Sequence, residues 1–299
     1  MQWHRCILIL AVTLLFGCQD SQPGDKSNSI AQTTLEQARA KGSLRIGYAN
    51  EAPYAYYDPE QDRLTGEAPE IARLVLKEMG VKNIEGVLTE FGALIPGLKA
   101  RRFDIIAAGM YITPERCREV AFSNPTYGVG GGFIVKNNNP KKLHSYENVA
   151  GQNKVKLGVV AGTVEINYAR KLGVPDDRLL IFPDALSALS GVKTGRVDAF
   201  SATSLTIQTL LNKAKDKTIE RARPFHDPVI DGKSIKGFGA FAVRKEDQNL
   251  LEALNRELAN FIGSPEHIRT VHPFGFSKGD LPGNVTADQV CRPETRQFE

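Results

Sequence analysis

The feature that most constrains the fold of this chain is a regular alternation, from Leu44 onward, of short β-rich apolar segments with helical patterns. In the first series the strand candidates are residues 44–49, 84–88 and 103–108, and the helical candidates are residues 67–80 and 93–100. The segment FDIIAA at 103–108 has the apolar character of a strand buried on both faces. Such alternation predicts an α/β fold with mainly parallel sheets.

A second series follows the glycine-dense stretch 128–132. Its strand candidates are residues 133–135, 155–160, 178–182 and 197–201, and helices are expected to begin at Thr163, Asp184 and Ser204. Residues 237–243 then form a further strand candidate, and residues 247–262 form a long amphipathic helix candidate.

The two series, with glycine-rich stretches at each passage between them, predict two lobes. We expect the first lobe to span residues 41–127 plus 239–292, the second to span 132–233, and hinges to lie near 128–131 and 234–238. The alternative for these glycines is that they are ordinary turn residues.

The N-terminus differs in composition from everything after it. His4 and Arg5 precede an apolar run over residues 6–16, which is too short to span a bilayer and predicts a secretory signal peptide at 1–17. The sequence LFGC at its end resembles a bacterial lipoprotein box, in which Cys18 is acylated; a soluble secreted chain or a buried structural cysteine are the alternatives. Residues 18–40 are expected to be a flexible tether. The expected location is the periplasmic or extracellular face of a membrane, with a lipid anchor on Cys18.

The remaining cysteines support an exported protein. Cys6 lies in the signal peptide and Cys18 would carry lipid, which leaves Cys117 and Cys291. Two such thiols in an exported chain favour a disulfide, and two unpaired buried thiols are the alternative.

Charge and motifs exclude several classes of function. The 38 Lys and Arg residues nearly balance the 34 Asp and Glu residues, and no long basic run occurs, so nucleic acid is not an expected partner. The chain lacks G-x-S-x-G, H-E-x-x-H and C-x-x-C motifs, and its five His lack metal-ligand spacing. We therefore expect no catalysis, no cofactor and no metal.

The segment 107–116 (AAGMYITPER) carries the strongest indication of a binding site. Pro114 suits the first turn of a helix, so Arg116 is expected at the C-terminal edge of the strand 103–108, where α/β folds bind ligands. The planar guanidinium of Arg116 matches a carboxylate bidentately. The simpler alternative is that Arg116 pairs with Glu115, Glu119 or another surface acid.

Several blocks of the sequence resemble a known family. The blocks are LRIGYANEAPY, TEFGALIPGLKARRFDIIAAGMYITPERCREVAFSNPTY, KLGVVAGTV and GRVDAF, and they resemble the polar amino-acid family of solute-binding proteins that feed ABC importers. The resemblance implies a type II periplasmic-binding-protein fold, in which two α/β lobes on a two-strand hinge trap a ligand without catalysis and present it to permease subunits.

The resemblance also implies site residues. Arg116 falls on the family's carboxylate-binding arginine, Gly109 on a backbone contact and Phe91 on an aromatic wall. Gly162 and Thr163 begin a helix of the second lobe, whose free amides can hold the same carboxylate. Thr163 can also be a plain N-cap, or serve both roles.

Two residues depart from the pattern of members that bind α-amino acids. Tyr111 replaces a Ser or Thr, and Thr203 replaces the Asp that pairs with the ligand's ammonium. A buried ammonium without a counter-charge is costly, whereas aromatic faces and one carboxylate can hold a delocalised cation.

The segments NEAPY and FDIIAAGMYITPERC closely resemble the ectoine and hydroxyectoine binding proteins of ABC importers. This implies a cage of Tyr54, Phe91 and Tyr111, with Glu51 as the carboxylate; core packing is the alternative for each ring. The expected ligand is a small zwitterion, ectoine or hydroxyectoine, bound by a monomer. The alternatives are a receptor for polar or basic amino acids, and a dehydratase on the same fold.

Overall fold

The computed structural model describes residues 32–292. The predicted signal peptide 1–17, the acylation site Cys18 and the tether as far as residue 31 lie outside these residues. No helix within the described residues is long and apolar enough to cross a membrane.

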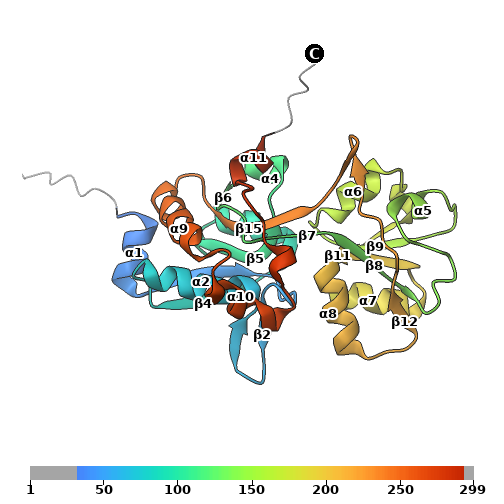
Figure 1. The fold of residues 1–299 in the computed structure, drawn as a ribbon, viewed down its shortest axis with the longest axis horizontal. Coiled ribbons are helices and arrows are strands. Elements are labelled where there is room, and N and C mark those ends of the chain that lie inside the picture. The colour runs from blue at the N-terminus through green and yellow to red at the C-terminus, as the bar shows by residue number, and fades with distance from the viewer. Residues whose placement is uncertain (1–31, 293–299) are drawn as a thin grey trace, which may run out of the picture. The chain divides into compact units, whose positions relative to one another are not determined.

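The first sheet has the strand order β4-β1-β5-β15-β6, and β7 also pairs with β15. Its strands are β1 (Ser43–Tyr48), β4 (Asn83–Leu88), β5 (Ile105–Tyr111), β6 (Ala121–Phe122), β7 (Tyr127–Val129) and β15 (Gly237–Val243). The accompanying helices are α1 (Thr34–Lys41), α2 (Glu67–Glu78), α3 (Leu94–Lys99), α4 (Pro114–Cys117), α9 (Gln248–Phe261), α10 (Pro265–Val271) and α11 (Ala287–Cys291). Short additions are the hairpin β2 (Tyr56–Asp58) and β3 (Arg63–Thr65), with 3₁₀ turns η1 (Phe91–Ala93), η3 (His272–Phe274) and η4 (Lys278–Asp280). We call these elements the first lobe (Figure 1).

The second sheet has the order β10-β9-β11-β8-β12. Its strands are β8 (Gly131–Lys136), β9 (Leu157–Val160), β10 (Leu179–Phe182), β11 (Ala199–Thr203) and β12 (Ile219–Arg221). Around it lie α5 (Tyr146–Ala150), α6 (Glu165–Lys171), α7 (Ala185–Thr194), α8 (Ser204–Ala214) and the 3₁₀ turn η2 (Asp176–Arg178), which together form the second lobe. A small hairpin of β13 (Val229–Ile230) and β14 (Lys233–Ser234) precedes the return to the first sheet in β15.

The strands and helices expected between residues 44 and 262 are present within a few residues of their predicted bounds. The prediction of mainly parallel sheets is wrong, because both sheets are mixed. Strand β1 is parallel to β4 and β5, and β9 is parallel to β10 and β11, but β15 is antiparallel to β5, β6 and β7, and β8 is antiparallel to β11 and β12. The antiparallel strands β8 and β15 are the ones by which the chain enters the second sheet and returns to the first.

The tether prediction is wrong from residue 34 onward, since α1 occupies Thr34–Lys41. Thr33 caps this helix with a capping box, in which its hydroxyl accepts from the amide of Glu36 and the Glu36 carboxylate accepts from the amide of Thr33. Leu35 and Ala38 are buried against the first lobe. The pattern Thr-x-x-Glu was the available signal for this helix.

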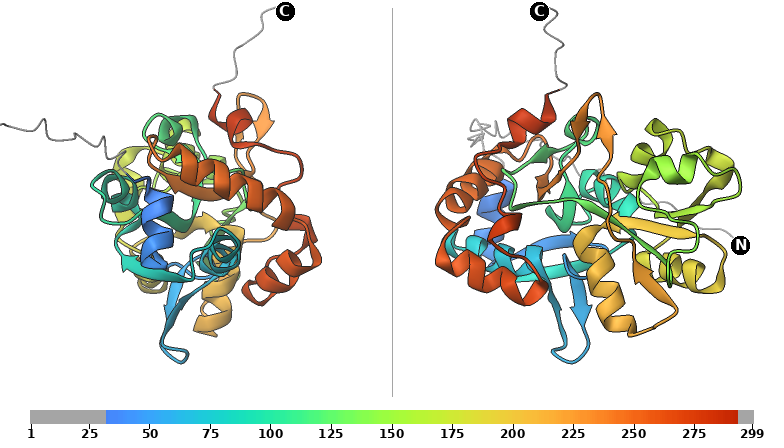
Figure 2. Two further views of the ribbon diagram at one scale, coloured as in Figure 1. Left: turned by 90° about the vertical axis from the view of Figure 1, so that its left-hand side faces the viewer. Right: turned by 45° about the vertical axis from the view of Figure 1, so that its right-hand side comes forward.

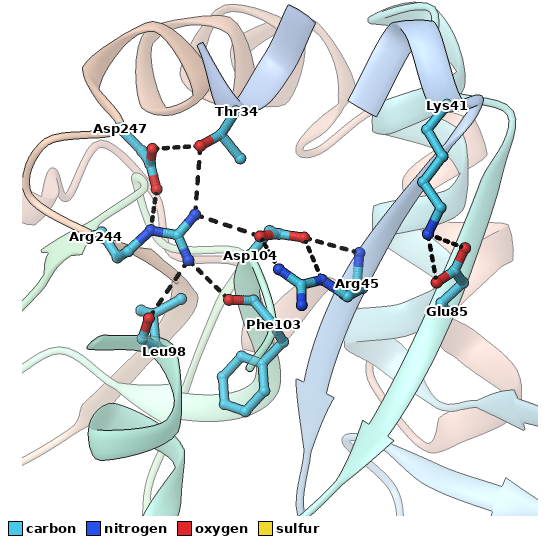
Figure 3. Close-up of polar contacts among 9 residues, drawn as sticks. All are labelled: Thr34, Lys41, Arg45, Glu85, Leu98, Phe103, Asp104, Arg244 and Asp247. Atoms are coloured by element: carbon cyan, nitrogen blue, oxygen red, sulfur yellow. Dashed lines mark hydrogen bonds and ion pairs between the residues drawn. The ribbon is translucent and has the colours of Figure 1, made fainter. Parts of the chain in front are cut away.

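A buried ion cluster holds the end of β15 in the first lobe (Figure 3). The side chain of Arg244 is 2% exposed, and its Nε lies 2.7 Å from Oδ2 of Asp247. Its Nη1 donates to the carbonyl of Phe103 at 2.8 Å, and its Nη2 lies 3.4 Å from Oδ1 of Asp104. Each nitrogen of this guanidinium therefore lies near an oxygen, although the contact between Nε and Asp247 is an ion pair without hydrogen-bond geometry.

The same cluster fixes α1 and β1. The hydroxyl of Thr34 donates to Oδ1 of Asp247 at 2.6 Å, and Arg45 donates to both oxygens of Asp104, at 2.8 and 3.0 Å. Segments far apart in the sequence are thus joined by charge-assisted hydrogen bonds, which are among the stronger polar contacts in proteins.

We predict that Arg244→Ala lowers the free energy of unfolding by about 3–5 kcal/mol, because it leaves the buried carboxylate of Asp247 without its cation, while Asp104 keeps only Arg45. The matched control is Lys41→Ala, which removes the exposed Lys41–Glu85 pair and is expected to change stability by less than about 1 kcal/mol. Urea unfolding curves measure both. Equal losses in the two variants would contradict the prediction.

Candidate functional site

A small cavity, with a volume of about 30 Å³, lies between the two lobes. The first lobe contributes Glu51, Tyr54, Phe91, Gly109, Tyr111 and Arg116, and the second contributes Val160, Thr163, Val164, Glu165, Ser201, Ala202 and Thr203. All the residues that the sequence suggested for a ligand site line this cavity except Gly162, which contacts Arg116 at its edge.

The cavity lies where strands of both sheets end. Strand β5 ends at Tyr111, β11 ends at Thr203, and β9 ends at Val160. The polar groups that follow these strands are therefore brought to one place, as is usual for binding sites in α/β folds.

Arg116 is held by its own helix and by both lobes. Thr113 is the N-cap of α4, Pro114 occupies the first turn, and the amide of Arg116 donates to the Thr113 hydroxyl at 3.2 Å. The guanidinium donates to the carbonyl of Tyr111 at 2.6 Å and, across the lobes, to the carbonyl of Gly162 at 2.9 Å. Partial burial lowers the pKa of Arg116.

The simpler alternative for Arg116 is not realised. None of the described carboxylates lies within ion-pair distance of its guanidinium, and Glu119 pairs with Lys99 instead. The guanidinium lies 5.5 Å from the centroid of the Phe91 ring. Two of its five N–H groups are used by carbonyls, so three can still bind an anion in the cavity.

The predicted aromatic residues line the cavity, with one further ring behind them. Tyr54 stacks on Tyr127 with ring centroids 5.2 Å apart, and Tyr111 lies 6.2 Å from Tyr127. Sequence reasoning missed Tyr127 as part of this wall, although it ends the FSNPTY motif. It reaches the site only through the pairing of β7 with β15.

The aromatic wall leaves no room for a side chain at Gly109. It lies where β5 bulges against β15, with φ +65°, and its carbonyl accepts from the Tyr127 hydroxyl at 2.8 Å. A Cβ at this position would come within 2.4 Å of the Tyr54 ring. A side chain here would therefore displace the ring from the cavity.

Hydroxyl groups connect the two lobes on the other side of the cavity. The Tyr54 hydroxyl donates to Oγ1 of Thr203 at 2.8 Å, and Thr203 donates to Oγ1 of Thr206 at 3.0 Å. Thr206 in turn donates to Oε1 of Glu51 at 2.8 Å. Sequence reasoning missed Thr206, whose signal is its place three residues after Thr203, the N-cap of α8.

Further out, Lys213 of α8 lies over the ring of Tyr56, with Nζ 4.6 Å from the ring centroid. Figure 2 shows α8 beside the β2–β3 hairpin that carries this tyrosine. The two lobes therefore meet directly outside the cavity as well.

Two carboxyl groups in the cavity are poorly solvated. Desolvation raises the pKa of Glu51 to about 7; the hydrogen bond from Thr206 opposes this shift and the charge of Glu165 adds to it. Burial also raises the pKa of Glu165, which is 6% exposed and was not identified from the sequence. These are the groups that a cationic ligand would stabilise in their charged form.

The prediction that Thr163 is the N-cap of a helix is wrong. Helix α6 begins at Glu165, its N-cap is Val164, and the Thr163 hydroxyl donates instead to the carbonyl of Val160 at 2.9 Å. The amide of Glu165 lowers the pKa of its own carboxylate, against the effect of burial. One amide at the start of α6 is thus already bonded to the carboxylate of Glu165.

A disulfide joins Cys117 to Cys291 and so links α4, directly after Arg116, to α11. Within residues 32–292, no group of three or more His, Cys, Asp or Glu side chains is arranged to hold a metal ion.

A carboxyl group also lies behind the aromatic wall. Oε1 of Glu67 accepts from the Thr126 hydroxyl at 2.7 Å, while its Oε2 is buried with no hydrogen-bond partner in the described part of the chain. Desolvation raises the pKa of Glu67 to about 8. Burial therefore favours the protonated form of this carboxyl group.

Comparison with protein families and curated proteins places these features among transport proteins. A family model of bacterial extracellular solute-binding proteins, family 3, matches residues 44–270. The probable amino-acid ABC transporter periplasmic-binding protein y4tE of Sinorhizobium fredii (strain NBRC 101917 / NGR234) is 41% identical over 256 residues, which cover 85% of this chain and 82% of that protein.

Solved structures show the same architecture. EhuB in complex with hydroxyectoine is similar with a TM-score of 0.79 and 34% identity, over 87% of this chain and 99% of that one. The ancestral amino acid-binding protein AncCDT-1, a precursor of cyclohexadienyl dehydratase, is similar with a TM-score of 0.69 and 28% identity, over 81% of this chain and 99% of that one. These matches confirm the predicted fold class, the bilobal α/β fold of type II periplasmic binding proteins.

We predict that Glu67→Gln flattens the dependence of stability on pH. Because the pKa of Glu67 is raised from 4.5 to about 8, the folded state holds a proton that the unfolded state releases between these pH values. The free energy of unfolding should therefore fall as pH rises through this window, by up to about 1.4 kcal/mol per pH unit for this group. The glutamine keeps an oxygen for Thr126 and does not titrate.

Urea unfolding at pH 5, 6, 7 and 8 measures this difference, which should grow in favour of the variant toward pH 8. Glu85→Gln is the control, because the hydrogen bond from Lys41 lowers the pKa of Glu85 and keeps it ionised over this range. Parallel profiles for wild type and Glu67→Gln would refute the assignment.

Proposed function

The chain belongs to the bacterial extracellular solute-binding proteins of family 3, and we propose that it captures ectoine or 5-hydroxyectoine for uptake by an ABC importer. As a solute-binding protein of an amino-acid-type ABC transporter, it takes a small-molecule ligand and works with permease subunits. The family and this relative are named for solute binding and transport, and we propose no catalytic activity for this chain.

The observation that carries this proposal is that one cavity holds a guanidinium with free donors, an aromatic wall and a carboxyl group. Arg116 would bind the carboxylate of the ligand with its remaining N–H groups. The rings of Tyr54, Phe91 and Tyr111 and the carboxylate of Glu51 suit a delocalised ring cation, for which each ring contributes about 0.5–2 kcal/mol. The likeness to EhuB, whose structure contains hydroxyectoine, supports the same ligand class.

In this proposal, Thr203 does not act as a counter-charge for an ammonium group. Its hydroxyl accepts from Tyr54 and from the amide of Thr206, and it donates to the Thr206 hydroxyl. Gly109, Gly162 and Thr163 would complete the site around the ligand's carboxylate, Gly109 through its backbone. A polar amino acid is the second candidate, because the relative y4tE is named for amino-acid transport and two carboxyl groups line the cavity.

We further propose that segments 128–131 and 234–238 act as hinges between lobes 41–127 plus 239–292 and 132–233. Closure brings Gly162 and Thr203 of the second lobe to the ligand, which then stabilises the closed form. The protein would act as a monomer, attached to the outer face of the membrane through acyl groups on Cys18, which lies outside the described residues.

We predict that isothermal titration shows tight binding of ectoine or hydroxyectoine, and weak or no binding of glycine betaine, glutamine and arginine. Arg116→Ala should weaken the binding by at least about 100-fold, because two charge-assisted hydrogen bonds to the carboxylate are lost. Arg116→Lys, which keeps the charge without the planar fork, should give a smaller loss. Binding of glutamine or arginine alone would overturn the proposed ligand and favour the amino-acid alternative.

Lobe closure yields a second prediction at Gly162. This residue has φ +77°, and a Cβ on it would lie 2.5 Å from the Cα of Gly92 in the other lobe. Gly162→Ala should weaken ligand binding by about tenfold or more, since neither backbone can give way without opening the cavity. Gly92→Ala is the matched control, because its Cβ would meet the carbonyl of Ala161 at an ordinary 3.5 Å.

Titration gives the affinities, small-angle X-ray scattering with saturating ligand reports the closed form, and thermal unfolding shows whether each variant is folded. Equal affinity of both alanine variants would show that this contact does not limit closure.

A further inference from the structure

Four side chains form a chain of hydrogen bonds between the lobes, which we call the clasp: Glu51, Tyr54, Thr203 and Thr206. Glu51 and Tyr54 belong to one turn of the first lobe, in which the amide of Tyr54 donates to the carbonyl of Glu51 at 3.0 Å. Thr203 and Thr206 belong to the first turn of α8 in the second lobe, where the amide of Thr206 donates to the hydroxyl of Thr203 at 3.1 Å. The two turns lie against each other and are joined by the hydrogen bonds of Tyr54 with Thr203 and of Thr206 with Glu51.

The hydrogen atoms of the clasp all point the same way. Tyr54 donates to Thr203, Thr203 donates to Thr206, and Thr206 donates to Oε1 of Glu51. Because each hydroxyl has one hydrogen, none remains to be donated elsewhere. The chain of donors therefore ends on the carboxylate that lines the cavity.

The position of Glu51 depends on Thr206. Its Oε1 accepts only from Thr206, and its Oε2 accepts no hydrogen bond from any residue between 32 and 292. Thr206 itself is fully buried, so no water replaces its hydroxyl in the closed form. When the lobes separate, Thr206 leaves with the second lobe and Glu51 stays with the first.

We propose that Thr206 is a specificity-determining positioning residue, which orients Glu51 toward the cation of the ligand only when the lobes close. This inference rests on the proposed function in that Glu51 is taken as the partner of the ligand's cation. When the lobes are closed and Thr206 holds the carboxylate of Glu51, the site binds zwitterions more tightly than anions of the same shape that lack a cation. Recognition of the cation is thereby coupled to closure, whereas Arg116 is in place on the first lobe beforehand.

Thr206→Val tests this role with little change of shape. The valine keeps the branched side chain, and the amide that caps α8 through Thr203 is retained. Two ligands are titrated: ectoine, and cyclohexanecarboxylate, which has a six-membered ring and a carboxylate but no cation. The ratio of their affinities is expected to fall about tenfold in Thr206→Val, through loss of ectoine binding alone, and to be restored in Thr206→Ser.

Two controls separate positioning from folding. Thr209→Val lies one turn further along α8, outside the clasp, and should leave the ratio unchanged. In a Glu51→Gln background, Thr206→Val should have no further effect on the ratio, since the two residues act as one unit.

Equal weakening of both ligands by Thr206→Val would overturn the inference, because it would show a general role in closure. An unchanged ratio would also overturn it. If the wild-type protein binds glutamine instead of the ectoines, the proposed ligand is wrong. The role of Thr206 is then tested by the ratio of the affinities for glutamine and for glutaramate, which is glutamine without its ammonium group. Absence of binding to the whole panel would contradict both.

Discussion

Removing a guanidinium from water is costly unless its donors find oxygen atoms, and the site is organised around how Arg116 meets this requirement. Its own strand supplies the carbonyl of Tyr111, and the second lobe supplies that of Gly162. Three donors are left over, on the side chain that lines the cavity. This partly satisfied cation joins the two lobes at Gly162, lies beside the ring of Phe91 and leaves donors for an anion.

Two groups of buried charged side chains in this protein differ in how far their charges are compensated by partners. Around Arg244, each cationic group has an anionic or carbonyl partner, and the cluster joins elements of a single lobe. In the cavity, Glu51 and Glu165 have raised pKa values because burial is only partly compensated. Satisfied charges hold a fold together, whereas incompletely satisfied ones mark the place where a ligand supplies the missing partner.

The sequence predicted those parts of the fold and the site that depend on local patterns. Strand β5, the first turn of α4 and the place of Arg116 follow from a buried strand and a Thr-Pro start. Tyr127, Glu165 and Thr206 were missed. Tyr127 reaches the aromatic wall only through the pairing of β7 with β15. Glu165 and Thr206 lie two and three residues after the predicted Thr163 and Thr203, and only the structure shows that their side chains are turned toward the site. The antiparallel pairing of β15 was also missed, since periodicity carries no information on the direction of the neighbouring strand.

The central position of β15 has a consequence for how the protein matures. All strands of the second sheet come from one stretch of chain, residues 131–221, whereas the first sheet lacks a strand until residues 237–243 have been made. During synthesis and export, the second lobe can assemble while the first still waits for its final strand. The half of the cavity that carries Arg116 therefore depends on a strand that is made after the whole of the second sheet.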